Sequence, residues 1–140
     1  PVYVAAPGKP REEETREPRG KETVLLAEDN RGVRELLTTQ LESYGYRILA
    51  AVDGEEALHR YENHEDELDV AVIDLRMPKI DGMEVIEEIR RRRPKLPVIL
   101  MSGNPGPFLD TNIDERDFTL VQKPFSAESL AEHIRRAIDS

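Results

Sequence analysis

Short apolar runs alternate along this chain with segments whose apolar residues recur at helical spacing. This alternation constrains the fold most, because it predicts parallel strands joined by helices that cover both faces of one sheet. The runs lack regular polar alternation, as expected for strands that are buried on both sides. We predict five strands, at residues 24–27, 47–52, 70–73, 97–101 and 118–121.

The segments between these strands carry helical stripes and helix starts. The four stripes are Val33, Leu36, Leu37 and Leu41; Ala57, Leu58 and Tyr61; Met83, Ile86 and Ile89; and Leu130, Ile134, Ala137 and Ile138. Four residues stand where N-caps belong, namely Asn30, Asp53, Asp81 and Ser126. Pro105, Gly106 and Pro107 interrupt residues 103–117, so a fourth helix there is predicted to be short or irregular. The expected fold is an α/β domain of (βα)₅ order.

The first residues have a different composition. Residues 7–22 combine proline, glycine and alternating charges without apolar periodicity, which is typical of a flexible linker. We therefore divide the chain into a linker at 1–22 and one domain at 23–140. Val2-Tyr3-Val4 resembles the last strand of a kinase ATP-binding domain, which would make the chain the C-terminal part of a larger kinase. A stand-alone domain with an N-terminal extension is the alternative.

Charge and composition exclude several functions. The formal net charge is −9 and arises beyond residue 22, so the domain surface repels phosphate backbones and argues against nucleic-acid binding. The basic run at 90–93 is interpreted as the solvated end of a helix. No apolar run is long enough to cross a bilayer, and no secretion signal is visible, so we expect no membrane contact. The absence of cysteine is compatible with a cytoplasmic location.

Polar residues follow the ends of four predicted strands. Glu28 and Asp29 follow the first, Asp74 the third, Ser102 the fourth and Lys123 the fifth. Sites in open parallel sheets form at the carboxyl ends of strands, so these side chains should meet at one edge. Three clustered carboxylates repel one another and need a proton or a cation, and an all-oxygen ligand set favours Mg²⁺. A carboxylate beside such a metal can act as a nucleophile toward phosphorus.

The sequence around these residues resembles the receiver domains of two-component response regulators and hybrid sensor kinases. The resemblance covers residues 23–140 and rests on four motifs: Leu-Leu-Ala-Glu28-Asp29-Asn30, Asp74-Leu-Arg-Met77-Pro78-Lys-Ile-Asp81-Gly82, Met101-Ser102-Gly103 and Gln122-Lys123-Pro124-Phe125. Each motif alone is weak, but together, in order and at strand ends, they are highly specific. The resemblance implies a flavodoxin-like, doubly wound sheet with strand order 2-1-3-4-5.

The resemblance also assigns roles to these residues. It implies that Asp74 is the phosphoacceptor, that Asp29 binds Mg²⁺ directly, and that Glu28 acts mainly through metal-bound water. The backbone carbonyl of Arg76 would complete the protein ligands, and Ser102 and Lys123 would contact the phosphoryl group. The Lys123–Pro124 bond would be cis. The implied donor is the phospho-histidine domain of a histidine kinase, with a histidine phosphotransfer protein as a further partner.

Other interpretations of these residues remain. Glu28 and Asp29 alone would most often cap a helix, and Ser102 or Lys123 alone would most often be inert at the surface. A Mg²⁺-dependent phosphohydrolase would carry a second Asp where Arg76 stands, and a nucleotide-binding module would carry a glycine-rich loop after the first strand. The serious rival is a degenerate receiver that only docks partners. Such a domain usually lacks an acid, the acceptor or the lysine, and this chain has all three. It is expected to catalyse nothing beyond its own phosphorylation and dephosphorylation.

Overall fold

The computed structural model describes residues 19–103, 118–123 and 125–139. Within these ranges, five parallel strands form one sheet in the order β2-β1-β3-β4-β5, as expected for a doubly wound α/β domain. The strands are β1 (Thr23–Ala27), β2 (Arg47–Ala51), β3 (Val70–Asp74), β4 (Val98–Ser102) and β5 (Thr119–Gln122). The described helices are α3 (Arg31–Ser43), α4 (Gly54–His64), α5 (Gly82–Arg92) and α7 (Ala127–Asp139). The predicted fourth helix of the domain and Pro124 lie outside the described residues.

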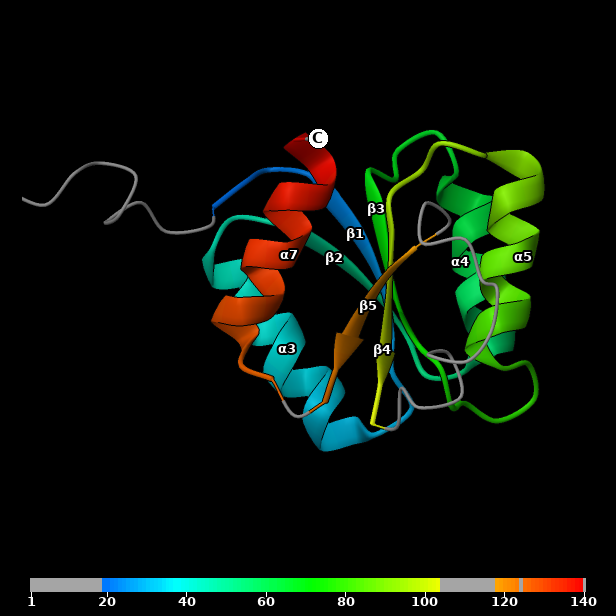
Figure 1. Cartoon of the computed structure of the whole chain (residues 1–140), viewed down its shortest axis with the longest axis horizontal. Helices are drawn as coiled ribbons and strands as arrows, with labels where there is room; N and C mark the ends of the chain where they lie inside the picture. Colours follow the sequence, from blue (N-terminus) through cyan, green and yellow to red (C-terminus); the bar gives the residue numbers. More distant parts are fainter. Residues whose placement is uncertain (1–18, 104–117, 124, 140) are drawn as a thin grey trace, which may run out of the picture.

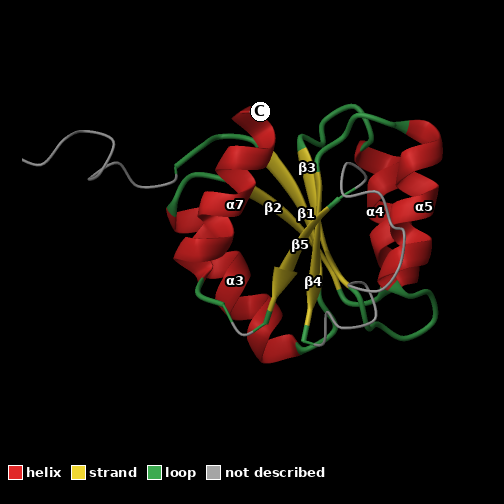
Figure 2. Cartoon of the chain, viewed as in Figure 1, coloured by secondary structure: helices red, strands yellow, loops and turns green. Residues whose placement is uncertain are grey.

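The helices form a layer on each face of the sheet. Helices α3 and α7 cover one face, and α4 and α5 cover the other (Figure 1; Figure 2). Every residue of β1, β3 and β4 is buried, which explains why their sequences are continuously apolar. Successive side chains of β1 point to opposite layers: Leu25 packs in the core on the α4/α5 side, and Leu26 packs in the core on the α3/α7 side.

The predicted helix starts are confirmed by their capping bonds. The side chains of Asn30, Asp53 and Asp81 accept hydrogen bonds from the backbone N–H groups of residues 33, 56 and 84. The Ser126 hydroxyl accepts one from the backbone N–H of Ser129 at 3.0 Å. Each cap satisfies a donor that the first helical turn leaves without a partner. These bonds also fix where the loops at the carboxyl edge end.

One residue of the predicted apolar stripes is not buried. Leu36 belongs to the apolar stripe expected on α3, yet its side chain is 55% exposed, whereas Leu37 and Leu41 are buried. Helix α3 packs on β1, β2 and α7, and Leu36 lies outside the face that Leu37 and Leu41 bury. Helical spacing in the sequence cannot show that Leu36 is exposed while Leu37 is buried, because the width of the buried face depends on how the neighbouring elements pack against α3.

The basic run lies at the carboxyl end of α5, where its positive charges oppose the negative end of the helix dipole. Three of its arginine side chains form hydrogen bonds or ion pairs with neighbouring groups. Arg90 donates to the carbonyl of Leu96 at 2.6 Å, Arg92 pairs with Glu62 at 3.4 Å, and Arg93 donates to the carbonyl of Leu68 at 2.6 Å. The run therefore ties α5 to α4 and to the following loop. Among the described helices, none is long and apolar enough to cross a membrane.

Candidate phosphoacceptor site

The sheet brings the predicted site residues to one edge. Asp74 is the last residue of β3, and Ser102 is the last residue of β4. Glu28 and Asp29 follow β1, which pairs with β3 so that Ala27 lies opposite Ile73. Lys123 follows β5, and its backbone N–H donates to the carbonyl of Ser102 at 2.8 Å. The edge includes the point between β1 and β3 where the chain changes direction across the sheet, which is where open α/β sheets form their sites.

Three carboxylates converge at this edge. One oxygen from each of Glu28, Asp29 and Asp74 lies within 4.8 Å of the other two. Glu28 is 0% exposed and Asp74 is 5% exposed, whereas Asp29 faces solvent. Burial removes water that would otherwise screen the negative charges, so the cluster is destabilising unless a cation or proton compensates it.

Lys123 supplies part of that compensation. Its Nζ donates to Glu28 Oε1 at 2.8 Å and lies 3.4 Å from Asp74 Oδ2. The other oxygen of Glu28 accepts the backbone N–H of Asn30 at 3.0 Å. Both Glu28 oxygens therefore have partners, which explains how a carboxylate without solvent contact is tolerated. The resemblance implies that Lys123 contacts the phosphoryl group, and in this structure its ammonium joins two of the three acids.

The cluster also shifts the proton affinity of its members. Burial, followed by the nearby negative charge of Glu28, raises the pKa of Asp74 to about 7, although Lys123 opposes the change. Burial alone would lower the pKa of Lys123, but its bonds and charge interactions with Glu28 and Asp74 raise it. Near neutral pH and without a metal, Asp74 therefore keeps a proton more readily than an ordinary aspartate. A cation bound beside it would displace that proton.

This shift predicts how stability depends on pH without metal. Between the pKa of an unfolded aspartate, about 4, and about 7, folded Asp74 keeps a proton that the unfolded chain releases, so the free energy of unfolding falls as pH rises. Asp74→Asn should therefore stabilise the protein in EDTA at pH 8 by about 1–3 kcal/mol, with the gain shrinking toward pH 4. Urea unfolding across this pH range measures the difference. A variant less stable than wild type at pH 8 would contradict the repulsion described here.

The donor chemistry of the edge fits a hard divalent cation. Three carboxylates face one ammonium, which leaves an excess of negative charge, and every available ligand atom is oxygen. A surface depression beside the cluster is lined by Asp29, Leu75, Arg76, Met77, Pro78 and Asp81. Arg76 thus borders the same depression as the exposed residue Asp29. The acidic cluster fits a Mg²⁺ site.

The loops after β1 and β3 are held by contacts that sequence reasoning missed. Lys79 adopts a left-handed backbone conformation, with φ of 72°, and its side chain lies 3.2 Å from Glu55 and 3.5 Å from Asp53. Arg34 on α3 donates to the backbone carbonyl of Glu28 at 3.0 Å. No sequence motif marks these roles, because each depends on how a loop approaches a neighbouring helix.

The described contacts of the three histidines lie away from this edge. His59 contacts Asn63, His64 contacts Glu67, and His133 contacts Arg136, all within or next to their own helices. None shares a contact with the acidic cluster among the described residues.

A buried aspartate with two neighbouring acids and a lysine, at the carboxyl edge of a 2-1-3-4-5 sheet, defines a class of phosphoacceptor signalling domain. The family model of the response regulator receiver domain matches residues 24–135. The chain belongs to this family.

Known relatives support the same assignment. The chain is 37% identical over 120 residues to the probable transcriptional regulator ycf27 of Guillardia theta, covering 84% of this chain and 46% of that protein. It is 34% identical over 121 residues to the sensor kinase CckA of Brucella abortus, covering 86% of this chain and 13% of the kinase. The chain therefore spans about half of one relative and a small part of the other.

Solved structures agree in fold. A response regulator receiver domain protein from Clostridium thermocellum is 28% identical with a TM-score of 0.76, covering 84% of this chain and 94% of that one. The receiver domain of the hybrid histidine kinase CckA is 31% identical with a TM-score of 0.70, covering 83% and 98%. TrrA of Thermotoga maritima, solved with Mg²⁺ and a beryllium fluoride, is 29% identical with a TM-score of 0.71, covering 83% and 98%.

Proposed function

We propose that Asp74 accepts a phosphoryl group from a phospho-histidine of a histidine kinase, in a reaction that requires Mg²⁺. One observation carries the proposal: a buried carboxylate at a strand end lies beside two more carboxylates and 3.4 Å from a lysine ammonium. The family supplies the reaction class, and the geometry supplies the residues. Neutral packing would be more stable than clustered acids, so this arrangement is best explained by function.

The residues would divide the work of phosphoryl transfer. An Asp74 carboxylate oxygen attacks phosphorus, an O–P bond forms, and the P–N bond to the donor imidazole breaks, leaving the imidazole to take up a proton. Asp29, Asp74 and the carbonyl of Arg76 would hold Mg²⁺, with Glu28 beside it, and the bound ion would neutralise phosphoryl oxygens. The structures of TrrA and of a Borrelia burgdorferi CheX–CheY complex, 27% identical, each include Mg²⁺ and a beryllium fluoride.

Two further residues would stabilise the added charge. Lys123 can exchange its contacts with Glu28 and Asp74 for a phosphoryl oxygen, since its ammonium has three donors and its side chain is 27% exposed. Ser102 is the last residue of β4, beside the end of β3, where its hydroxyl can donate to another phosphoryl oxygen. The chemistry of the chain is then limited to its own phosphorylation and dephosphorylation. A docking-only receiver is not favoured by any described contact.

The relatives also suggest which partners and which parent protein this domain has. Matches to both regulators and sensor kinases favour two partners, the phospho-histidine domain of a kinase and a histidine phosphotransfer protein. A hybrid kinase that carries this domain is our preferred parent, with the phosphorylation occurring in the cytoplasm. The acidic surface favours protein contacts over contacts with nucleic acid or membrane.

The proposal is tested with a small phosphodonor. Incubation with acetyl phosphate and Mg²⁺ should add one phosphoryl group to the intact protein, because the carboxylate nucleophile and charge neutralisation are both present. Intact-mass spectrometry measures the adduct. Asp74→Asn and wild type in EDTA should both remain unmodified. Full labelling of either would refute the assignment.

A further inference from the structure

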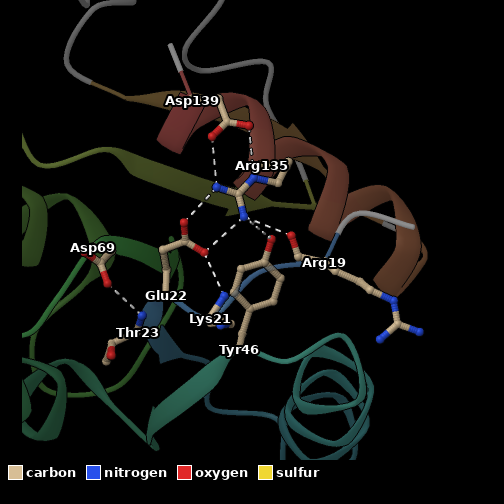
Figure 3. Close-up of polar contacts among 8 residues, drawn as sticks. All are labelled: Arg19, Lys21, Glu22, Thr23, Tyr46, Asp69, Arg135 and Asp139. Atoms are coloured by element: carbon tan, nitrogen blue, oxygen red, sulfur yellow. Dashed lines mark hydrogen bonds and ion pairs between the residues drawn. The ribbon is translucent and has the colours of Figure 1, made fainter. Parts of the chain in front are cut away.

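The four residues before β1 are bound to the domain by a cluster centred on Arg135 of α7 (Figure 3). We call residues 19–22 the entry segment. Arg135 donates to both carboxylate oxygens of Glu22, at 2.7 and 3.0 Å, and to the backbone carbonyl of Arg19 at 2.9 Å. It also donates to both oxygens of Asp139, at 2.9 and 3.0 Å. One guanidinium thus forms two forked pairs and holds a backbone group.

This cluster differs from the ordinary ion pairs of the helix surfaces. The side chains of Arg135 and Glu22 are 25% and 26% exposed, whereas those of the Arg31–Glu35 pair on α3 are 82% and 62% exposed. A hydrogen bond from Arg135 is the main reason why the pKa of Glu22 falls to about 2. A bidentate, partly buried arginine–carboxylate pair has a well-defined geometry, whereas an exposed ion pair contributes little to stability.

The backbone of the entry segment is equally constrained. The Gly20 N–H donates to the carbonyl of Tyr44 at 3.1 Å, and the Arg47 N–H donates to the carbonyl of Glu22 at 3.0 Å. Gly45 has a φ of 106°, and a Cβ there would lie 2.3 Å from the carbonyl oxygen of Gly20. Neither glycine has room for a side chain, because a Cβ on Gly20 would meet the Tyr46 ring at 2.5 Å. The segment is therefore seated between α7 and the loop that leads into β2.

We propose that the Arg135 cluster is an intramolecular docking site for the chain that enters the domain. The folded unit then begins at Arg19, rather than at Thr23 where composition places the boundary. The cluster lies at the amino edge of the sheet, since Thr23 and Arg47 begin β1 and β2, and Asp74 lies at the opposite edge. Any domain joined upstream is tethered at a fixed point between α3 and α7, away from the acidic cluster.

Trypsin tests this proposal, because the Arg19–Gly20 bond is a cleavage site inside the docked segment. In the full chain this bond should resist trypsin. Arg135→Gln should raise its cleavage rate at least roughly tenfold, because the substitution removes the charged hydrogen bonds to Glu22 and to the carbonyl of Arg19. Arg136→Gln is the matched control, because Arg136 lies on the same helix and, in the described part of the chain, its side chain contacts His133 rather than the entry segment. It should cleave as wild type does.

Hydrogen exchange separates release of the segment from loss of the fold. In Arg135→Gln the Gly20 amide should exchange roughly tenfold faster while amides of β1 and β3 keep their protection. If that variant unfolds, Glu22→Gln preserves side-chain shape, removes the charge, and should give the same local pattern. The proposal is overturned if the wild-type Arg19–Gly20 bond is cleaved as rapidly as in Arg135→Gln. It is equally overturned if Gly20 exchange is unchanged in both variants.

Discussion

Replacing Lys123 by methionine is expected to lower the free energy of unfolding in EDTA by about 1–3 kcal/mol. The reason is that Lys123 is the ammonium that pairs with Glu28, whose side chain is fully buried, and with Asp74. Removing one partner of a buried ion pair leaves an uncompensated charge, which lowers the free energy of unfolding. Because Lys123 is partly exposed, this loss should be smaller than for a fully buried pair. Methionine keeps much of the apolar volume, so the loss would be mainly electrostatic.

Magnesium distinguishes this explanation from simple loss of packing. Saturating Mg²⁺ should stabilise Lys123→Met more than it stabilises wild type, because the ion replaces the missing positive charge. Urea unfolding with EDTA and with Mg²⁺ gives both differences. Lys79→Met is the matched control, since the Lys79 side chain is 57% exposed and its ion pairs should contribute little to stability. Equal stability of Lys123→Met and wild type in EDTA would contradict the charge balance described here.

Gly82→Ala is expected to destabilise the protein by about 2–4 kcal/mol and to slow phosphorylation of Asp74. A Cβ at Gly82 would lie 2.5 Å from the carbonyl oxygen of Asp74 and 2.8 Å from Leu75 Cα, and both atoms belong to the backbone. The Gly82 N–H also donates to the carbonyl of Leu75 at 2.8 Å, which closes the loop. The methyl group must therefore displace the end of β3, where overpacking is costly and where the acceptor is positioned.

Gly32→Ala provides the control for this change. Gly32 lies in the first turn of α3, and a Cβ there would meet only Asn30 Oδ1, at an ordinary 3.5 Å. Alanine is the better helix former, so this variant should be unchanged or more stable by up to about 1 kcal/mol. Thermal unfolding compares the two variants, and acetyl phosphate labelling measures the acceptor. A Gly82→Ala protein with wild-type stability would show that the loop yields more easily than its contacts indicate.

Much of the fold was predictable because local and global signals agree. The apolar runs that became β1, β3 and β4 are buried throughout, and Asn30, Asp53, Asp81 and Ser126 cap the helices that follow. The acids at 28, 29 and 74 were predicted to converge because parallel strands share a carboxyl edge. Topology alone gives this result without any knowledge of side-chain packing.

The remaining features depend on how elements approach one another in space. Arg135 and Glu22 are separated by 113 positions, and nothing in either local sequence marks their pairing. Leu36 looked like a core residue because helical spacing does not reveal how wide the buried face is. The pairing of Lys123 with Glu28 also needs the structure, since it depends on the closeness of two side chains from strands at different places in the sheet.

The most direct test of the account is to locate the phosphoryl group after labelling. Borohydride reduces an aspartyl acyl phosphate to homoserine, so peptide mass mapping of the labelled and reduced protein identifies the acceptor residue. We expect homoserine at residue 74 alone, and only when Mg²⁺ was present during labelling. Homoserine at position 29, or phosphate on a histidine or serine with Asp74 unmodified, would contradict the central claim.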